Sequence, residues 1–226
     1  AFFYVYVLMQ VPAGVLYDKY GPRIILGLAS LLLGAGCLLL SYVSSYDTAF
    51  LARMLLGAGA SFGFVGMLLV SAMWFPPRHF ALMVGLAETL GMLGSSAGEN
   101  VMAWVVQHLG WRISMCASGV IALGLFVLCV AFVRRNPAYH AHVEAAPALS
   151  MGLQIKRALS SRVVWLAGAF GFFMFAIVNA FTSLWGVPFL QATHHLSLSR
   201  AAAVTSVAFI GIALGAPLGG WVCMKL

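Results

Sequence analysis

Charged side chains are scarce in this sequence, which has five acidic and twelve basic residues among 226 positions. Charged residues make up 8% of the chain and hydrophobic residues 63%, whereas soluble domains have roughly 25% charged and 45–50% apolar residues. This shortage excludes an ordinary soluble globular domain and indicates an integral membrane protein. The net charge of +7 is then explained by topology and lipid contact, and we expect no nucleic-acid partner.

Cysteine is also rare, and its placement argues against disulfides and metal sites. Cys37, Cys116, Cys129 and Cys223 lie far apart inside apolar segments, without CxxC spacing. We interpret them as small buried hydrophobic residues. The sequence also lacks a nucleophile–base pair, a P-loop and a haem motif. It therefore gives no support for an enzyme, for ATP-driven transport or for a cofactor.

Long apolar runs of helical length dominate the chain. They predict spanning α-helices rather than a β-barrel, whose strands would alternate every second residue over about ten positions. The fold class we expect is an all-α polytopic membrane protein. The predicted segments are residues 1–16, 24–45, 48–74, 81–109, 113–133, 163–190 and 201–224.

The basic residues predict the orientation of these segments in the membrane. Only Arg112 and Arg200 fall on the side opposite the loop that contains Lys19 and Arg23. The positive-inside rule places the basic side in the cytoplasm, as expected for a multi-pass protein of the inner (plasma) membrane. The other residues on the basic side are Arg78, Arg134, Arg135, Lys156, Arg157, Arg162 and Lys225.

A long polar connection divides the chain into two predicted bundles. Residues 1–133 form the first bundle, residues 134–162 a cytoplasmic linker, and residues 163–226 the start of a second bundle. Within the linker, the stretch MGLQIKRALSSR is amphipathic and is predicted to lie along the membrane interface. Both ends of the sequence stop inside apolar runs, so we expect an internal piece of a longer chain.

The stretch GVLYDKYGPR, residues 14–23, concentrates charge between two apolar segments. It resembles the loop between the second and third helices of the major facilitator superfamily, whose pattern is roughly G-x-L-x-D-[RK]-x-G-[RK]-[RK]. Pro22 replaces one of the usual basic residues. The residues that fill the pattern are Gly14, Leu16, Asp18, Lys19, Gly21 and Arg23.

Two further stretches are similar to the same family. RMLLGAG, with Arg53, resembles a fourth-helix signature, and Gly110-Trp111-Arg112 resembles the GWR found where the fifth helix ends. The resemblance implies helices two to eight of a partial two-bundle transporter with twelve helices, the first helix missing. It also implies that the charges of the loop, Asp18 above all, form a gate between the bundles. The alternative is a solvated anchor that only sets topology.

Arg53, Glu88 and Glu99 are ionisable residues inside predicted spans, where a charge costs at least about 2.5–3.5 kcal/mol. Glu88 and Glu99 are almost three helical turns apart and therefore share one face. Beside that face, Ala87, Gly91, Gly94 and Gly98 form a stripe of small residues, on which we expect another helix to pack closely.

These residues suggest substrate and proton sites. We expect Glu99 to be the leading protonation site, Glu88 a second one, and Arg53 a partner for Glu99 or for an anionic substrate. A fixed Arg–Glu pair joining two helices is the equally weighted alternative. Gln10 and Asn179 add hydrogen-bonding groups to the predicted pathway.

The function predicted from these patterns is secondary active transport of a small polar or anionic solute by alternating access, as a proton symporter and a monomer. Two alternatives stay open. One is a proton/solute antiporter, although residues 85–98 lack the proline that the antiporter pattern of the family carries. The other is a transporter-like receptor that binds without translocating.

Overall fold

The computed structural model describes residues 1–134 and 151–225, and this part of the chain consists of helices joined by short connections. Five of the described helical segments are long and apolar enough to cross a bilayer, which confirms a multi-pass, all-α membrane protein. The helices are α1 (Phe2–Ser41), α2 (Tyr46–Trp74), α3 (Pro77–Leu109), α4 (Trp111–Phe132), α6 (Met151–Ser160), α7 (Arg162–Asn179), the π-helix η1 (Ala180–Trp185), α8 (Gly186–His194) and α9 (Leu198–Lys225).

The helix α1 reverses direction at a single residue. Gly21 has φ 75° and ψ 167°, so α1 consists of two helices, residues 2–20 and 22–41. The sequence predicted a connecting loop of several residues, but both helices continue up to Gly21. Pro22 directly follows the turn, at the first position of a helix, where its fixed φ and missing N–H are tolerated.

Both halves of α1 pack against α2 around a small buried core. This core contains Ala13, Tyr17, Ile25, Ala29 and Phe62. The Tyr17 hydroxyl donates a hydrogen bond of 2.8 Å to the backbone carbonyl of Phe62, so its polar end is satisfied where water is excluded. The two rings also meet edge to face, with centroids 6.2 Å apart.

The second half of α1 and α4 form an antiparallel pair that an arginine ties at each end. Arg23 Nε donates to the Val130 carbonyl at the end of α4 (2.8 Å). At the opposite end, Arg112 donates to the carbonyls of Ser41 (3.2 Å) and Val43 (3.0 Å). The last carbonyls of a helix lack intrahelical donors, and the two guanidinium groups supply them.

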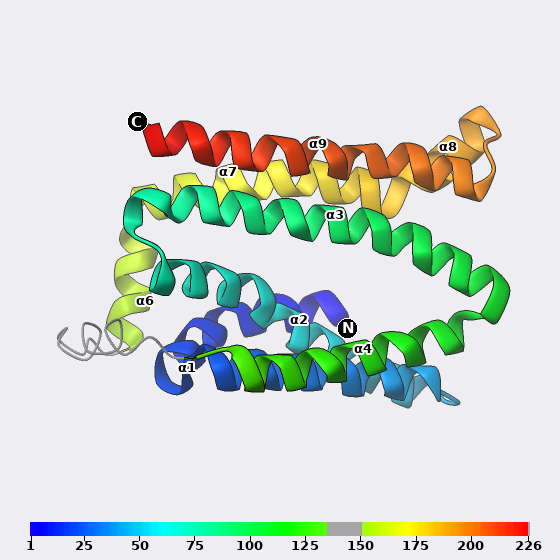
Figure 1. Ribbon diagram of the computed structural model, residues 1–226, viewed down its shortest axis with the longest axis horizontal. Coiled ribbons are helices and arrows are strands. Elements are labelled where there is room, and N and C mark those ends of the chain that lie inside the picture. Colours follow the sequence, from blue (N-terminus) through cyan, green and yellow to red (C-terminus); the bar gives the residue numbers. More distant parts are fainter. Residues whose placement is uncertain (135–150, 226) are drawn as a thin grey trace.

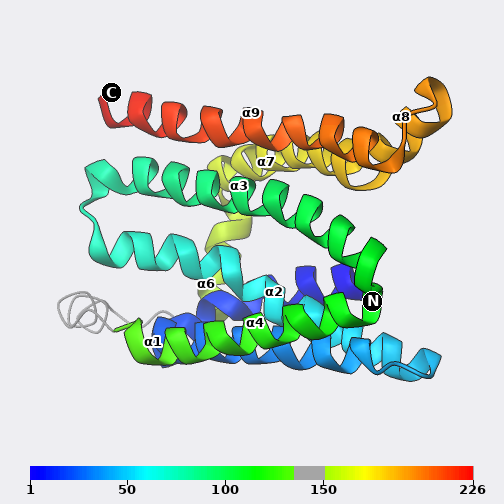
Figure 2. The ribbon, with the colours of Figure 1, turned by 45° about the vertical axis from the view of Figure 1, so that its right-hand side comes forward.

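The helix α3 leaves this group and packs chiefly against α9, next to α7 (Figures 1 and 2). The amphipathic helix α6 and the C-terminal end of α9 lie at one end of the molecule, and the α3–α4 and α8–α9 connections lie at the other (Figure 1). The segments with most of the basic residues therefore share one end, as the predicted orientation requires. We call it the inner end.

The apolar run 163–190 was expected to form one helix, and the structure interrupts it. It forms α7, the π-helical turn η1 and the start of α8. A π-helical turn inserts an extra residue into the helical ladder and is frequent at functional sites. The predicted amphipathic segment of the linker does form the helix α6, and Trp165 Nε1 at the start of α7 donates to the Leu159 carbonyl (2.8 Å).

Candidate functional site

The helices α3 and α9 touch backbone to backbone near their inner ends. A Cβ atom on Gly85 would lie 2.5 Å from the Ala216 carbonyl oxygen and 3.1 Å from Pro217 Cα. A Cβ atom on Gly220 would lie 2.6 Å from the Ala81 carbonyl oxygen. Only glycine permits this approach at either position, because the opposing atoms belong to the backbone and cannot rotate away.

The sequence predicted close helix packing at a different part of α3. Within the described part of the chain, no helix packs on the predicted stripe of Gly91, Gly94 and Gly98, because a Cβ atom on any of the three would meet nothing within 4 Å. Towards the outer end, α3 and α9 diverge, as Figure 2 shows. The close contact is therefore confined to the inner halves of the two helices.

A hydroxyl group from α3 completes the contact by satisfying a backbone group of α9. Pro217 has no N–H, so the carbonyl of Ala213, four residues earlier, has lost its helical donor. Thr89 Oγ1 lies 2.8 Å from that oxygen and 2.9 Å from the Gly85 carbonyl, so its hydrogen can be donated to either one. A neighbouring threonine is a usual way to satisfy a carbonyl freed by proline in a membrane helix.

Glu88 lines a cavity of about 370 Å³ beside this contact. Four helices contribute its walls, namely α2, α3, α7 and α9, and Glu88 supplies the only ionisable side chain among the lining residues. A lone carboxyl group against apolar walls is costly to keep ionised, and such groups mark functional positions in membrane proteins. The other lining residues are Phe64, Val84, Met92, Met174, Phe175, Phe209 and Ile212.

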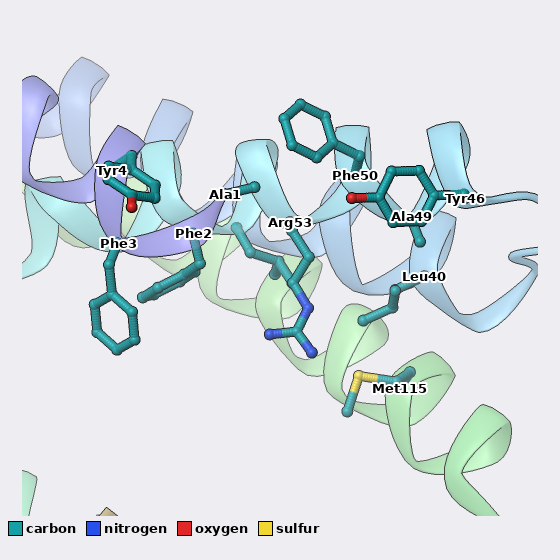
Figure 3. A pocket seen from close by; sticks show the side chains of 11 residues that line it. Ala1, Phe2, Phe3, Tyr4, Leu40, Tyr46, Ala49, Phe50, Arg53 and Met115 are labelled. Atoms are coloured by element: carbon teal, nitrogen blue, oxygen red, sulfur yellow. The ribbon is translucent and has the colours of Figure 1, made fainter. Parts of the chain in front are cut away.

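Arg53 lines a different cavity, of about 690 Å³, near the outer end of α2. Its guanidinium group extends from α2 towards α4 with the Phe2 ring of α1 beside it, whereas the Phe50 ring points to the other side of α2 (Figure 3). Arg53 forms no ion pair or hydrogen bond with the described residues. A single cation among aromatic and aliphatic walls is suited to an anionic group with an apolar body.

The residues of the GVLYDKYGPR loop lie at the inner end of the molecule, around the turn of α1. Asp18 and Lys19 are exposed, and the Lys19 ammonium lies 5.2 Å from the centre of the Tyr20 ring. Within the described part of the chain, Asp18 makes no ion pair. Gly21 forms the turn and Arg23 ties it to α4, whereas Gly14 lies in the helix with no atom within 4 Å of an added Cβ.

Three other predicted residues contribute less to this picture. Gln10 is half-buried on α1. Glu99 and Asn179 belong to α3 and α7, but their side chains lie outside the described part of the structure. The predicted pairing of Arg53 with Glu99 therefore stays a prediction. Among the described residues, no group of three or more metal-ligating side chains is found.

Comparison with known proteins decides the family. The model of the Major Facilitator Superfamily matches residues 1–226. The chain belongs to the Major Facilitator Superfamily. The matched residues include the three stretches on which the resemblance was based. They are the α1 turn, the signature with Arg53, and Gly110-Trp111-Arg112.

Several relatives are named as transporters. The chain is 28% identical over 152 residues to the probable sulfoacetate transporter SauU of Cupriavidus necator, covering 67% of this chain and 35% of that protein. It is 26% identical over 234 residues to the hexuronate transporter of Bacillus subtilis, covering 97% and 54%. It is 26% identical over 208 residues to the gallate transporter of Pseudomonas putida, covering 78% and 45%. The chain thus spans between 35% and 54% of the length of these relatives.

The sequence did not reveal that α3 and α9 pack against each other. The glycines around Pro217, including Gly220, indicated a flexible or closely packed helix, but nothing paired them with Gly85 and Thr89 of α3. Pro217 was the available signal. A proline inside a helix frees the carbonyl four residues earlier, and a neighbouring helix must then offer a donor.

Proposed function

We propose that this superfamily member is a secondary active transporter that moves a small organic anion across the inner (plasma) membrane by alternating access, as a proton symporter. The two moving bodies are residues 1–133 and the bundle that begins at residue 163, joined by the linker 134–162. The proposal rests chiefly on one observation, which is that the Glu88 cavity lies between helices of both bodies.

The contact between α3 and α9 supports alternating access. On α9 the contact lies on the inner side of the residues that line the Glu88 cavity, and on α3 the two sets of residues alternate. The contact would therefore narrow the path between that cavity and the inner end. Its tightest points depend on two glycines and one hydroxyl group. A contact of this kind can be broken and re-formed when one bundle rocks against the other. Asp18, Lys19, Gly21 and Arg23 would act at the same end as a gate.

The substrate class is supported by Arg53 and by the relatives. Sulfoacetate, hexuronate and gallate, which name three of these relatives, are all organic anions. A guanidinium group binds carboxylate and sulfonate oxygens with two parallel hydrogen bonds, and the apolar walls of the Arg53 cavity suit an apolar body. Arg53 would therefore bind the anionic group.

Glu88 is the residue that we propose for proton coupling, with Glu99 as the second candidate. Arg53 and Glu88 line separate cavities, so the anion would have to pass from one to the other. An ionised Glu88 would repel the anion on that path and a protonated Glu88 would admit it, so proton and anion would move together. One proton moving down one pH unit supplies about 1.4 kcal/mol, enough for roughly tenfold accumulation of a solute.

We therefore expect Glu88→Gln to lose accumulation driven by a pH gradient while retaining exchange of substrate across the membrane, since glutamine keeps the shape and removes the titrating group. The protein would be reconstituted in liposomes and tested with sulfoacetate, a hexuronate and gallate. Per pH unit, accumulation should fall from roughly tenfold to about equal concentrations.

Glu88→Asp is the matched control, because it keeps a carboxyl group in the cavity, and Glu99→Gln tests the other candidate. Wild-type accumulation in Glu88→Gln together with its loss in Glu99→Gln would transfer the role to Glu99. Accumulation only against the proton gradient would replace symport with antiport. Binding without flux in the wild type would replace transport with a receptor function.

A further inference from the structure

A basic hollow lies at the inner end of the α1–α4 pair, away from both cavities described above. Its volume is about 630 Å³, and it is lined by Arg23, Ile24, Val130, Ala131 and Arg134. We call it the Arg23–Arg134 hollow. Two guanidinium groups face a space whose other lining side chains are all apolar, and no acidic residue is among them.

Arg23 is held in place for a ligand. Its Nε donates to the Val130 carbonyl (2.8 Å), which fixes the plane of the guanidinium group and satisfies one of the last carbonyls of α4. Its terminal nitrogens make no hydrogen bond with the described residues. Because the end of a helix carries partial negative charge, a second cation is needed to make the hollow attractive to an anion, and Arg134 supplies it.

The surface beside the hollow is suited to acyl chains. On the last two turns of α4, Val127 is 61% exposed, Leu128 is 51% exposed and Phe132 is 76% exposed. Ile24, which lines the hollow itself, is 54% exposed. An apolar helix surface that ends in two arginines is complementary to a phospholipid. The acyl chains would lie along the helix, and the phosphate would lie at its end.

We propose that the Arg23–Arg134 hollow binds an anionic phospholipid of the inner leaflet. The two arginines donate hydrogen bonds to the phosphodiester oxygens, and the exposed side chains of α4 contact the acyl chains. A soluble phosphate would use the same two donors but would gain nothing from the apolar surface. Since Arg23 belongs to the GVLYDKYGPR loop, the bound lipid would lie next to the proposed gate.

Native mass spectrometry of the purified protein in detergent tests this proposal, with phosphatidylglycerol and phosphatidylcholine of identical chains as the probes. Phosphatidylglycerol should bind more tightly to the wild type, and Arg134→Gln should weaken it about fivefold without changing phosphatidylcholine. That factor corresponds to the contribution of about 1 kcal/mol that one basic residue makes near an anionic surface.

Arg78→Gln is the matched control, because it removes an exposed arginine of the same inner end that does not line the hollow. It should bind phosphatidylglycerol as the wild type does. Equal losses in Arg134→Gln and Arg78→Gln would overturn the proposal in favour of general attraction to basic charge. Displacement of the lipid by millimolar inorganic phosphate would overturn it in favour of a soluble anion, and lack of preference in the wild type would exclude the site.

Discussion

Replacing Gly85 with valine is expected to abolish most transport by preventing closure of the inner end. The new Cβ atom would lie 2.5 Å from the Ala216 carbonyl oxygen, so α3 and α9 must separate. Overpacking of this kind costs about 1–3 kcal/mol, which lowers the population of the inner-closed state roughly 5- to 150-fold. Uptake into liposomes should fall accordingly, and a thiol reagent added on the inner side should reach cysteines placed in the Glu88 cavity faster.

Gly91→Val provides the matched control, because it makes the same change six residues further along α3, where an added Cβ meets no described atom within 4 Å. It should transport almost as well as the wild type. Equal loss of transport in both variants would mean that valine disturbs α3 generally. Full transport by Gly85→Val would show that the contact is not needed for the cycle.

Gly21→Ala is expected to destabilise the protein, whereas Gly14→Ala is not, although both glycines belong to the same motif. Gly21 has φ 75° and ψ 167°, a region essentially restricted to glycine, so a side chain there costs about 1–3 kcal/mol. Gly14 lies inside a helix with free space around it, and alanine there should add about 0.5–1 kcal/mol of stability.

Thermal unfolding in detergent, followed by the fraction of protein that stays monodisperse, measures both effects. The midpoint should decrease for Gly21→Ala and remain or increase for Gly14→Ala. Similar decreases in both variants would indicate that the motif glycines contribute through packing rather than backbone geometry. An unchanged midpoint in Gly21→Ala would contradict the turn described for α1.

Much of the fold was predictable because the bilayer imposes length and apolarity on each helix. The apolar runs gave the helices, and the amphipathic stretch after Pro147 gave α6. The interruption of the run 163–190 by η1 was not predictable, because a π-helical turn leaves the composition of a segment unchanged. The turn of α1 was also predicted too wide, since hydropathy averages over several residues and Gly21 acts alone.

The candidate site was predictable only in part, because it depends on contacts between distant helices. Helical periodicity identified a face of α3 with Glu88, but it did not reveal that Phe64, Met174 and Phe209 would surround it. The same limit explains the misplaced stripe of glycines. A stripe shows that a helix can be approached closely, whereas the partner helix and the depth of contact depend on tertiary packing.

The central claim is that α3 and α9 close the inner end and open the outer end in a reciprocal motion. Spin-label distances test it directly, using one exposed pair near the inner end, at Arg78 and Cys223, and one near the outer end, at Gln107 and Arg200. In a background without the native cysteines, apart from Cys223 in the inner pair, Gly85→Val should lengthen the inner distance and shorten the outer one relative to the unsubstituted protein in the same background. Lengthening of the inner distance with an unchanged or longer outer distance would show local separation of two helices and would contradict the account.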